Sequence, residues 1–144
     1  MLGKSEDRQV AEIEKMAGAS DKASFARLVG MKTIRAQRGY ALTTMTVASE
    51  KHLNFLGLTH GAVLFALADH ACSVCGNSLG RKAVLLQSNM NFFSNTRPGQ
   101  TIEAEANILA EDDTTATLDI VIREKGGKLL ARCQSIVFFV AADT

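Results

Sequence analysis

The stretch that decides the fold runs from Thr59 to Gly80 and reads "THGAVLFALADHACSVCGNSLG". From residue 61 to residue 78 it is apolar on nearly every side, and its length and its alanine and leucine content favour a helix over a strand. A helix that is apolar all round is a buried helix. The sequence therefore predicts one central, buried helix over residues 61–78, ended by the turn-forming "NSLG".

The segments around this helix have the composition of strands. Two β-rich runs, "MKTIRAQRG" and "YALTTMTVAS", precede it and are separated at Gly39. Four more follow it, separated by turn-forming breaks: "AVLLQSNMNFFS", "QTIEAEANILA", "TATLDIVIRE" and "KLLARCQSIVFFVA". The order predicts an α+β architecture in which sequential antiparallel strands wrap around the central helix.

The N-terminal part of the chain is helical in pattern. Residues 5–17 place Val10, Ile13 and Ala17 at helical spacing, and residues 21–29 are consistent with one or two further helical turns. We therefore divide the chain into an N-terminal helical segment, residues 1–24, and one domain, residues 25–144.

The composition excludes several classes of function. The chain has 144 residues, 47% of them hydrophobic and 22% charged, and a net charge of +1, which gives no support to binding of nucleic acid or a membrane surface. No run reaches the roughly 18 to 20 apolar residues of a membrane span. The N-terminus lacks the apolar core of a signal peptide, and three cysteines make no disulfide framework. These features predict a cytoplasmic protein.

Asp69 is the unusual residue of the central helix, because an ionised carboxylate is costly to bury unless it is paired or used. The helix begins with Thr59 or His60 as its cap, so the N–H groups of Gly61 and Ala62 are expected to have no partner within the helix and to suit an oxyanion. Asp69 lies eight residues further on, about 12 Å along the axis.

One thioester carbonyl group cannot contact both the Gly61 N–H and the Asp69 carboxylate of the same helix. Either Gly61 and Asp69 are unrelated, or a second copy of the chain brings its Asp69 to the Gly61 of the first. The second alternative predicts an obligate dimer with two equivalent sites at the interface.

The stretch "HLNFLGLTHGAVLFALADHACSVCGNSLG" resembles the signature of hot-dog-fold acyl-CoA thioesterases of the phenylacetate-degradation (PaaI-like) type. That signature has an asparagine, a His-Gly six residues later, "LAD" on the central helix and an "N-S-x-G" ending. Asn54, His60, Gly61 and Asp69 keep its spacing. A looser likeness extends from Phe25 to Val140.

The resemblance implies a hot-dog fold and the hydrolysis of small to medium, including aryl, acyl-CoA thioesters. Asp69 then acts as nucleophile or general base, and the Gly61 N–H of the partner subunit polarises the carbonyl. Asn54 helps to bind the oxygen or to position water, and His60 shapes the turn and lines the site. The family forms homodimers or homotetramers and needs no metal or other cofactor. Two alternatives are a hot-dog 3-hydroxyacyl-thioester dehydratase and a non-enzymatic acyl-thioester binding module.

The chain departs from the family at three places. Ala62 stands where the family has a second glycine. Gln87 stands where relatives often carry a Ser or Thr facing the carboxylate, with Ser88 adjacent but on the other face of the strand. The turn over residues 110–115 is acidic, which is unsuited to CoA phosphates. Either Arg97, Arg81 or Lys82 makes that contact, or the acyl carrier is not CoA. Ser94 is a further candidate for contact with substrate.

Several of these residues also have a plain structural interpretation. Asn54 can be a turn residue, and His60 has no serine or cysteine partner to activate. Cys72 and Cys75 have redox-motif spacing but lie in mid-helix, so packing is expected. The polar residues Gln87, Asn89 and Asn91 share one strand face, which could line either a substrate channel or an interface.

Overall fold

The computed structural model describes residues 3–142 and contains one six-stranded antiparallel sheet. The strands are β1 (Lys32–Gln37), β2 (Tyr40–Thr46), β3 (Ala83–Phe92), β4 (Thr101–Glu111), β5 (Thr115–Glu124) and β6 (Leu129–Phe139). Their order in the sheet is β1-β2-β4-β5-β6-β3. All six predicted strands are present, and the predicted α+β hot-dog architecture is confirmed.

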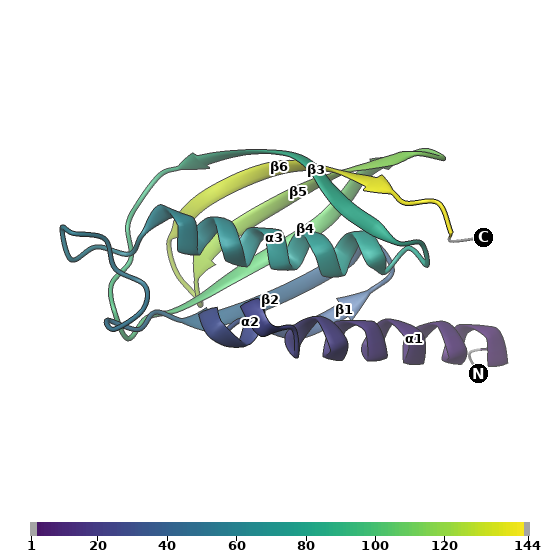
Figure 1. The fold of residues 1–144 in the computed structure, drawn as a ribbon, viewed down its shortest axis with the longest axis horizontal. Coiled ribbons are helices and arrows are strands. Elements are labelled where there is room, and N and C mark those ends of the chain that lie inside the picture. The colour runs from purple at the N-terminus through teal and green to yellow at the C-terminus, as the bar shows by residue number, and fades with distance from the viewer. Residues whose placement is uncertain (1–2, 143–144) are drawn as a thin grey trace.

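The sheet curves around one helix, α3 (Gly61–Asn77), as Figure 1 shows. Leu67 and Val74 of α3 are fully buried. They belong to the same apolar core as Ile102, Leu118 and Ile120, which come from β4 and β5. Burial of this apolar surface is the main favourable contribution to the fold. The alternation over residues 101–108 of β4 and 115–122 of β5 sends every second side chain toward this core, as the sequence predicts.

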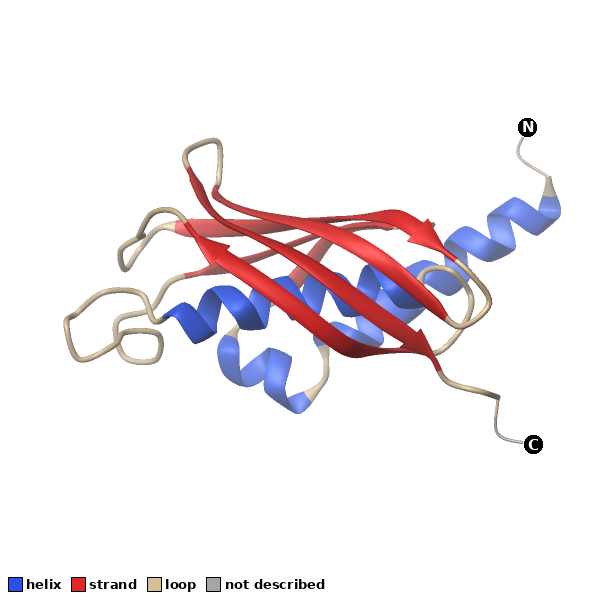
Figure 2. Ribbon diagram, turned by 90° about the horizontal axis from the view of Figure 1, so that it is seen from above, coloured by secondary structure: helices blue, strands red, loops and turns tan. Residues whose placement is uncertain are grey.

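The N-terminal segment forms two helices, α1 (Lys4–Asp21) and α2 (Ser24–Val29). α1 is longer than predicted and packs against β1 and α3, with Ile13 and Ala17 buried. α2 ends at Gly30, whose φ of 91° suits glycine. Figure 2 shows all three helices on one side of the sheet. None of the helices in residues 3–142 is long and apolar enough to cross a membrane.

Strand β3 forms one edge of the sheet. It follows α3 in the chain and, among residues 3–142, pairs only with β6, so its other side carries backbone groups that no described residue pairs with. The pairing with β6 shifts register between Leu85 and Gln87, which is the mark of a β-bulge at Leu86. Val84, Leu86 and Phe92 of this strand are exposed apolar residues.

Candidate active site

The beginning of α3 presents one free N–H group. His60 is the N-cap, and its Nδ1 accepts a hydrogen bond from the Ala62 N–H at 3.0 Å. The Ala62 N–H has no partner within the helix, as predicted, but the side chain of the N-cap residue occupies it. In the described chain the Gly61 N–H has no hydrogen-bond acceptor. It lies at the positive end of the α3 dipole, where an anionic oxygen is stabilised.

Gly61 also packs closely against the ring of Phe92. A Cβ atom at this position would lie 3.3 Å from the ring of Phe92, which comes from the edge strand β3. The start of α3 therefore sits against the edge of the sheet.

Asn54 organises the loop before α3. Its Oδ1 accepts hydrogen bonds from the Leu56 N–H at 3.0 Å and the Leu58 N–H at 3.1 Å. Its own N–H donates to the Leu58 carbonyl at 2.8 Å. The side-chain oxygen of Asn54 is thus occupied by the loop, and only its amide NH₂ group remains to contact a ligand.

The Asp69 carboxylate is half-buried two turns further along α3. Among residues 3–142 it has neither a hydrogen-bond donor nor a cationic partner. Burial raises the pKa of the Asp69 carboxyl above its ordinary value, and the charge of His70 offsets part of that effect. A half-buried carboxylate with a raised pKa and no partner is what a general base or nucleophile requires.

Asp69 lines a hollow of about 180 Å³ on the outer side of α3. Ala66, His70 and Ser73 of α3 share this hollow with residues of the N-terminal helices and the start of β1. The residues on the N-terminal side are Ser20, Ala23, Phe25, Ala26 and Met31.

Gln87 and Ser88 lie on opposite faces of β3, and the bulge at Leu86 decides which one faces the helix. Ser88 pairs with Ser135, which is buried under α3, and its Oγ lies 2.8 Å from Ser135 Oγ and 2.9 Å from Cys133 Sγ. Gln87 pairs with Ile136 and is exposed on the face turned away from α3. Regular alternation along the strand predicts Gln87 at the helix-facing position, and the bulge places Ser88 there instead.

The loop after β3 carries Ser94 and Arg97 and is tied to the segment that enters α3. Thr59 Oγ1 donates to the Thr96 carbonyl at 2.7 Å, two residues before Gly61. Ser94 Oγ donates to the Leu129 carbonyl at 2.7 Å, while the Arg97 side chain is exposed. Both predicted residues therefore belong to a loop that lies beside the start of α3.

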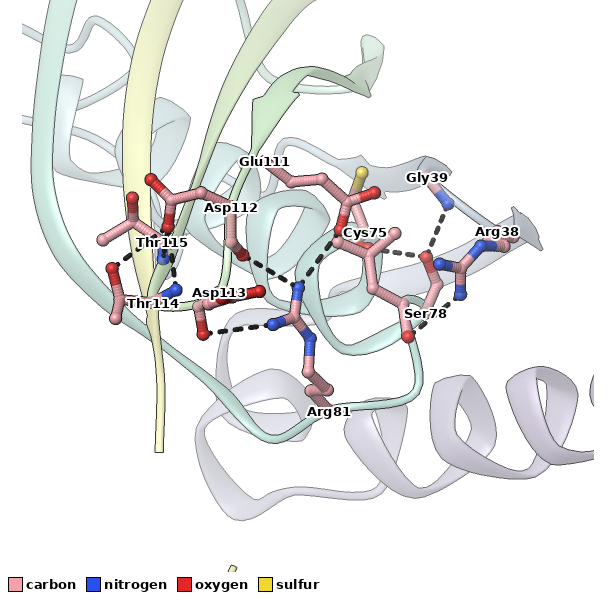
Figure 3. Close-up of polar contacts among 11 residues, drawn as sticks. Arg38, Gly39, Cys75, Ser78, Arg81, Glu111, Asp112, Asp113, Thr114 and Thr115 are labelled. Atoms are coloured by element: carbon pink, nitrogen blue, oxygen red, sulfur yellow. Dashed lines mark hydrogen bonds and ion pairs between the residues drawn. The ribbon is translucent and has the colours of Figure 1, made fainter. Parts of the chain in front are cut away.

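Arg81, by contrast, is held by the acidic turn between β4 and β5 (Figure 3). Its guanidinium donates to the carbonyls of Asp112 and Asp113 and to the Glu111 carboxylate, each at 3.2 Å. It also lies 3.6 Å from the centre of the Phe139 ring. These contacts leave Arg81 poorly placed to bind a phosphate, whereas Arg97 and Lys82 are exposed.

The cysteines of α3 are packing residues. Burial raises the pKa of both Cys72 and Cys75 to about 12, so both stay protonated thiols at neutral pH. In the described part of the chain no group of three or more His, Cys, Asp or Glu side chains could hold a metal ion.

Comparison with known proteins identifies the family. The family model described as Thioesterase superfamily matches residues 56–131, which include all of α3 and β3. The acyl-coenzyme A thioesterase PaaI of Escherichia coli is 33% identical over 106 residues, which cover 74% of this chain and 75% of that protein.

Two solved structures of PaaI proteins have folds similar to that of this chain. The structure of Escherichia coli PaaI has a TM-score of 0.85 and 26% identity, and covers 93% of this chain and 95% of that one. A point mutant of the phenylacetic acid degradation protein PaaI from Thermus thermophilus has a TM-score of 0.78 and 31% identity, and covers 82% of this chain and 100% of that one. The chain belongs to the thioesterase superfamily and is a thioester hydrolase with the PaaI-like hot-dog fold.

Proposed function

We propose that this protein hydrolyses acyl-CoA thioesters to a free acid and CoA, at sites that combine Gly61 of one subunit with Asp69 of its partner. The observation that carries the proposal is the pair of unsatisfied groups on α3: the free N–H of Gly61 and the partnerless, half-buried carboxylate of Asp69. The similarity to the acyl-coenzyme A thioesterase PaaI supports the substrate class.

The chemistry follows from the two groups. The Gly61 N–H donates a hydrogen bond to the thioester oxygen and stabilises the negative charge that develops on it. Asp69 either attacks the carbonyl carbon, giving a mixed anhydride that water then hydrolyses to the free acid, or removes a proton from a water that attacks the carbonyl carbon directly. In both cases the C–S bond breaks and CoA leaves as its thiolate. Burial raises the pKa of Asp69, which makes its carboxylate a stronger base than an exposed one.

The edge of the sheet supports the shared site. The unpaired edge of β3 carries the exposed apolar side chains Val84, Leu86 and Phe92, and such an edge is a template for pairing with another strand. Pairing of two β3 strands across a two-fold axis would set the two α3 helices side by side and antiparallel. The start of one α3 would then approach the middle of the other, because Gly61 packs against Phe92 of β3.

The test is release of free thiol from a panel of acyl-CoA thioesters by the wild type and by Asp69→Ala. Loss of the base is expected to lower kcat by at least about 10²-fold. Absence of turnover of every acyl-CoA by the wild type would refute the proposed activity. Full activity of Asp69→Ala would refute the role of Asp69 while leaving the activity intact.

A further inference from the structure

A second concavity lies next to the hollow that Asp69 lines. It is a groove of about 450 Å³ between α2 and the first half of α3. Phe25, Leu28 and Val29 of α2 form one wall, and Ala62, Val63 and Ala66 of α3 form the other, with Lys51 and His52 at its margin. We infer that this groove receives the acyl group of the thioester substrate and that α2 selects acyl groups of medium size. The inference rests on the proposed function.

The groove adjoins the hollow that Asp69 lines. Phe25 and Ala66 line both the groove and the hollow of Asp69. Ala66 follows Ala62 by four residues and precedes Asp69 by three, and this spacing places all three residues along one side of α3. An acyl chain whose carbonyl is held at Asp69 can therefore run along this side toward Ala62. The distance along the axis is about 10 Å.

The shape and polarity of the groove suit an apolar group larger than acetyl. Its volume falls within the range of small-molecule sites. The two alanines on α3 leave space, while Phe25 and Leu28 opposite them are 58% and 69% exposed. An acyl group in the groove would cover these side chains and remove apolar surface from water, which is the driving force for such binding. Either an alkyl chain or an aromatic ring has this chemistry.

The wall that α2 provides is fixed at both ends. Before α2, the Asp21 carboxylate accepts hydrogen bonds from the Thr33 N–H at 2.8 Å and the Thr33 hydroxyl at 2.7 Å. It also contacts His70 Nε2 at 2.9 Å, and His70 is the neighbour of Asp69 on α3.

At the other end of α2, a hydrogen bond from the His52 side chain holds the last residue of the helix. The Nδ1 of His52 accepts from the Ala48 N–H at 2.9 Å, so its Nε2 carries the proton that is donated to the Val29 carbonyl at 2.8 Å. A six-residue helix has little stability of its own. These attachments therefore hold a preformed groove at a set distance from α3.

The experiment compares the acyl preference of groove variants with that of a matched surface variant. Phe25→Ala removes part of the α2 wall, Ala66→Leu fills the groove, and Phe138→Ala removes a partly exposed phenylalanine from β6, on the sheet face turned away from the helices. We would measure kcat/KM for acetyl-CoA, octanoyl-CoA and phenylacetyl-CoA. The octanoyl and phenylacetyl arms distinguish an alkyl from an aromatic occupant.

We expect Phe25→Ala and Ala66→Leu each to lower the ratio of kcat/KM for the preferred larger substrate to that for acetyl-CoA by about tenfold, the effect of losing a few buried methylene contacts. Phe138→Ala should leave this ratio unchanged. Ratios within twofold of the wild type in both groove variants would overturn the inference. So would a changed oligomeric state in size-exclusion chromatography with an unchanged acyl preference, because the groove would then be an interface between copies of the chain.

A second measurement separates this inference from the proposed function. If the wild type hydrolyses no acyl-CoA, the proposed function fails, and calorimetric binding of a non-hydrolysable octanoyl-CoA thioether then tests the groove alone. A dissociation constant about tenfold weaker in Phe25→Ala than in Phe138→Ala supports the groove as an acyl site. Equal binding by the two variants, or no binding by the wild type, overturns it.

Discussion

The Gly61 N–H can be deleted with little disturbance of the fold, because Gly61 is the first residue of α3. Proline is favoured at the first helical position, where its missing N–H has no intrahelical partner. The residue before a proline must be extended, and His60 already has φ −65° and ψ 133°. Gly61→Pro therefore removes the proposed oxyanion donor and keeps the helix.

Gly61→Ala is the matched control, since alanine adds the same Cβ atom but retains the N–H. That atom lies 3.3 Å from Phe92, a 54% exposed side chain whose ring can give way by the few tenths of an ångström required. Both variants share the added Cβ atom, so they differ in the N–H and in the two further ring carbons of proline.

The size of the effect follows from the number of donors at the start of α3. Because His60 occupies the Ala62 N–H, Gly61 supplies the only free one there among the described residues. Loss of one oxyanion donor costs about 10²- to 10³-fold in kcat. We expect Gly61→Pro to be slower than Gly61→Ala by that factor in a thiol-release assay, with similar circular dichroism spectra. A difference below about twofold would refute the role of this N–H.

Three further predictions concern Asp69, Asn54 and Ser88. The acid limb of the kcat/KM profile should lie above the ordinary aspartate pKa of 3.8, because burial raises the pKa of Asp69. Asp69→Asn should raise the melting temperature at pH 7. This gain in melting temperature should shrink as the pH falls through the raised pKa of Asp69 in the folded state, and it should vanish below the pKa of Asp69 in the unfolded state. A gain that persists at that low pH would contradict the reasoning. Asn54→Asp retains the side-chain oxygen that accepts from the Leu56 and Leu58 amides, so these amides should keep their hydrogen-exchange protection. The NH₂ group is lost, and kcat/KM should fall about tenfold. An unchanged kcat/KM would show that the Asn54 NH₂ group has no part in the site. Ser88→Ala should lower the free energy of unfolding in urea by about 1 kcal/mol, because Ser135 loses a hydrogen-bond partner. Gln87→Ala should lower it by less than about 0.5 kcal/mol. The reverse order would refute the placement of Ser88 toward α3 and of Gln87 away from it.

The central helix and the strands could be predicted because their patterns are local. The apolar run of α3 is too long for a strand and ends in turn-forming residues, so the predicted span of residues 61–78 is close to the observed Gly61–Asn77. Residues 101–108 of β4 and residues 115–122 of β5 alternate in both sequence and structure. The residues of the proposed site followed from the family signature around Gly61 and Asp69, and their roles remain predictions.

The features that the sequence did not reveal depend on irregular or long-range contacts. A β-bulge at Leu86 inverts the faces of the residues around it, and alternation alone gives no sign of it. The bond between the His60 ring and the Ala62 N–H depends on a side-chain rotamer. The contact between Asp21, at the end of α1, and His70 of α3 joins residues that are 49 positions apart, and no local pattern indicates it.

The shared site is the central claim, and mixing two inactive variants tests it most directly. In a dimer of Gly61→Pro with Asp69→Ala, one site contains both substitutions and the other contains neither. Random reassociation of equal amounts should therefore restore about a quarter of the wild-type activity, since half of the dimers are mixed and each has one intact site. If each site were built from a single subunit, every site would carry one substitution. The mixture would then be no more active than the separate variants, and that result would contradict the account.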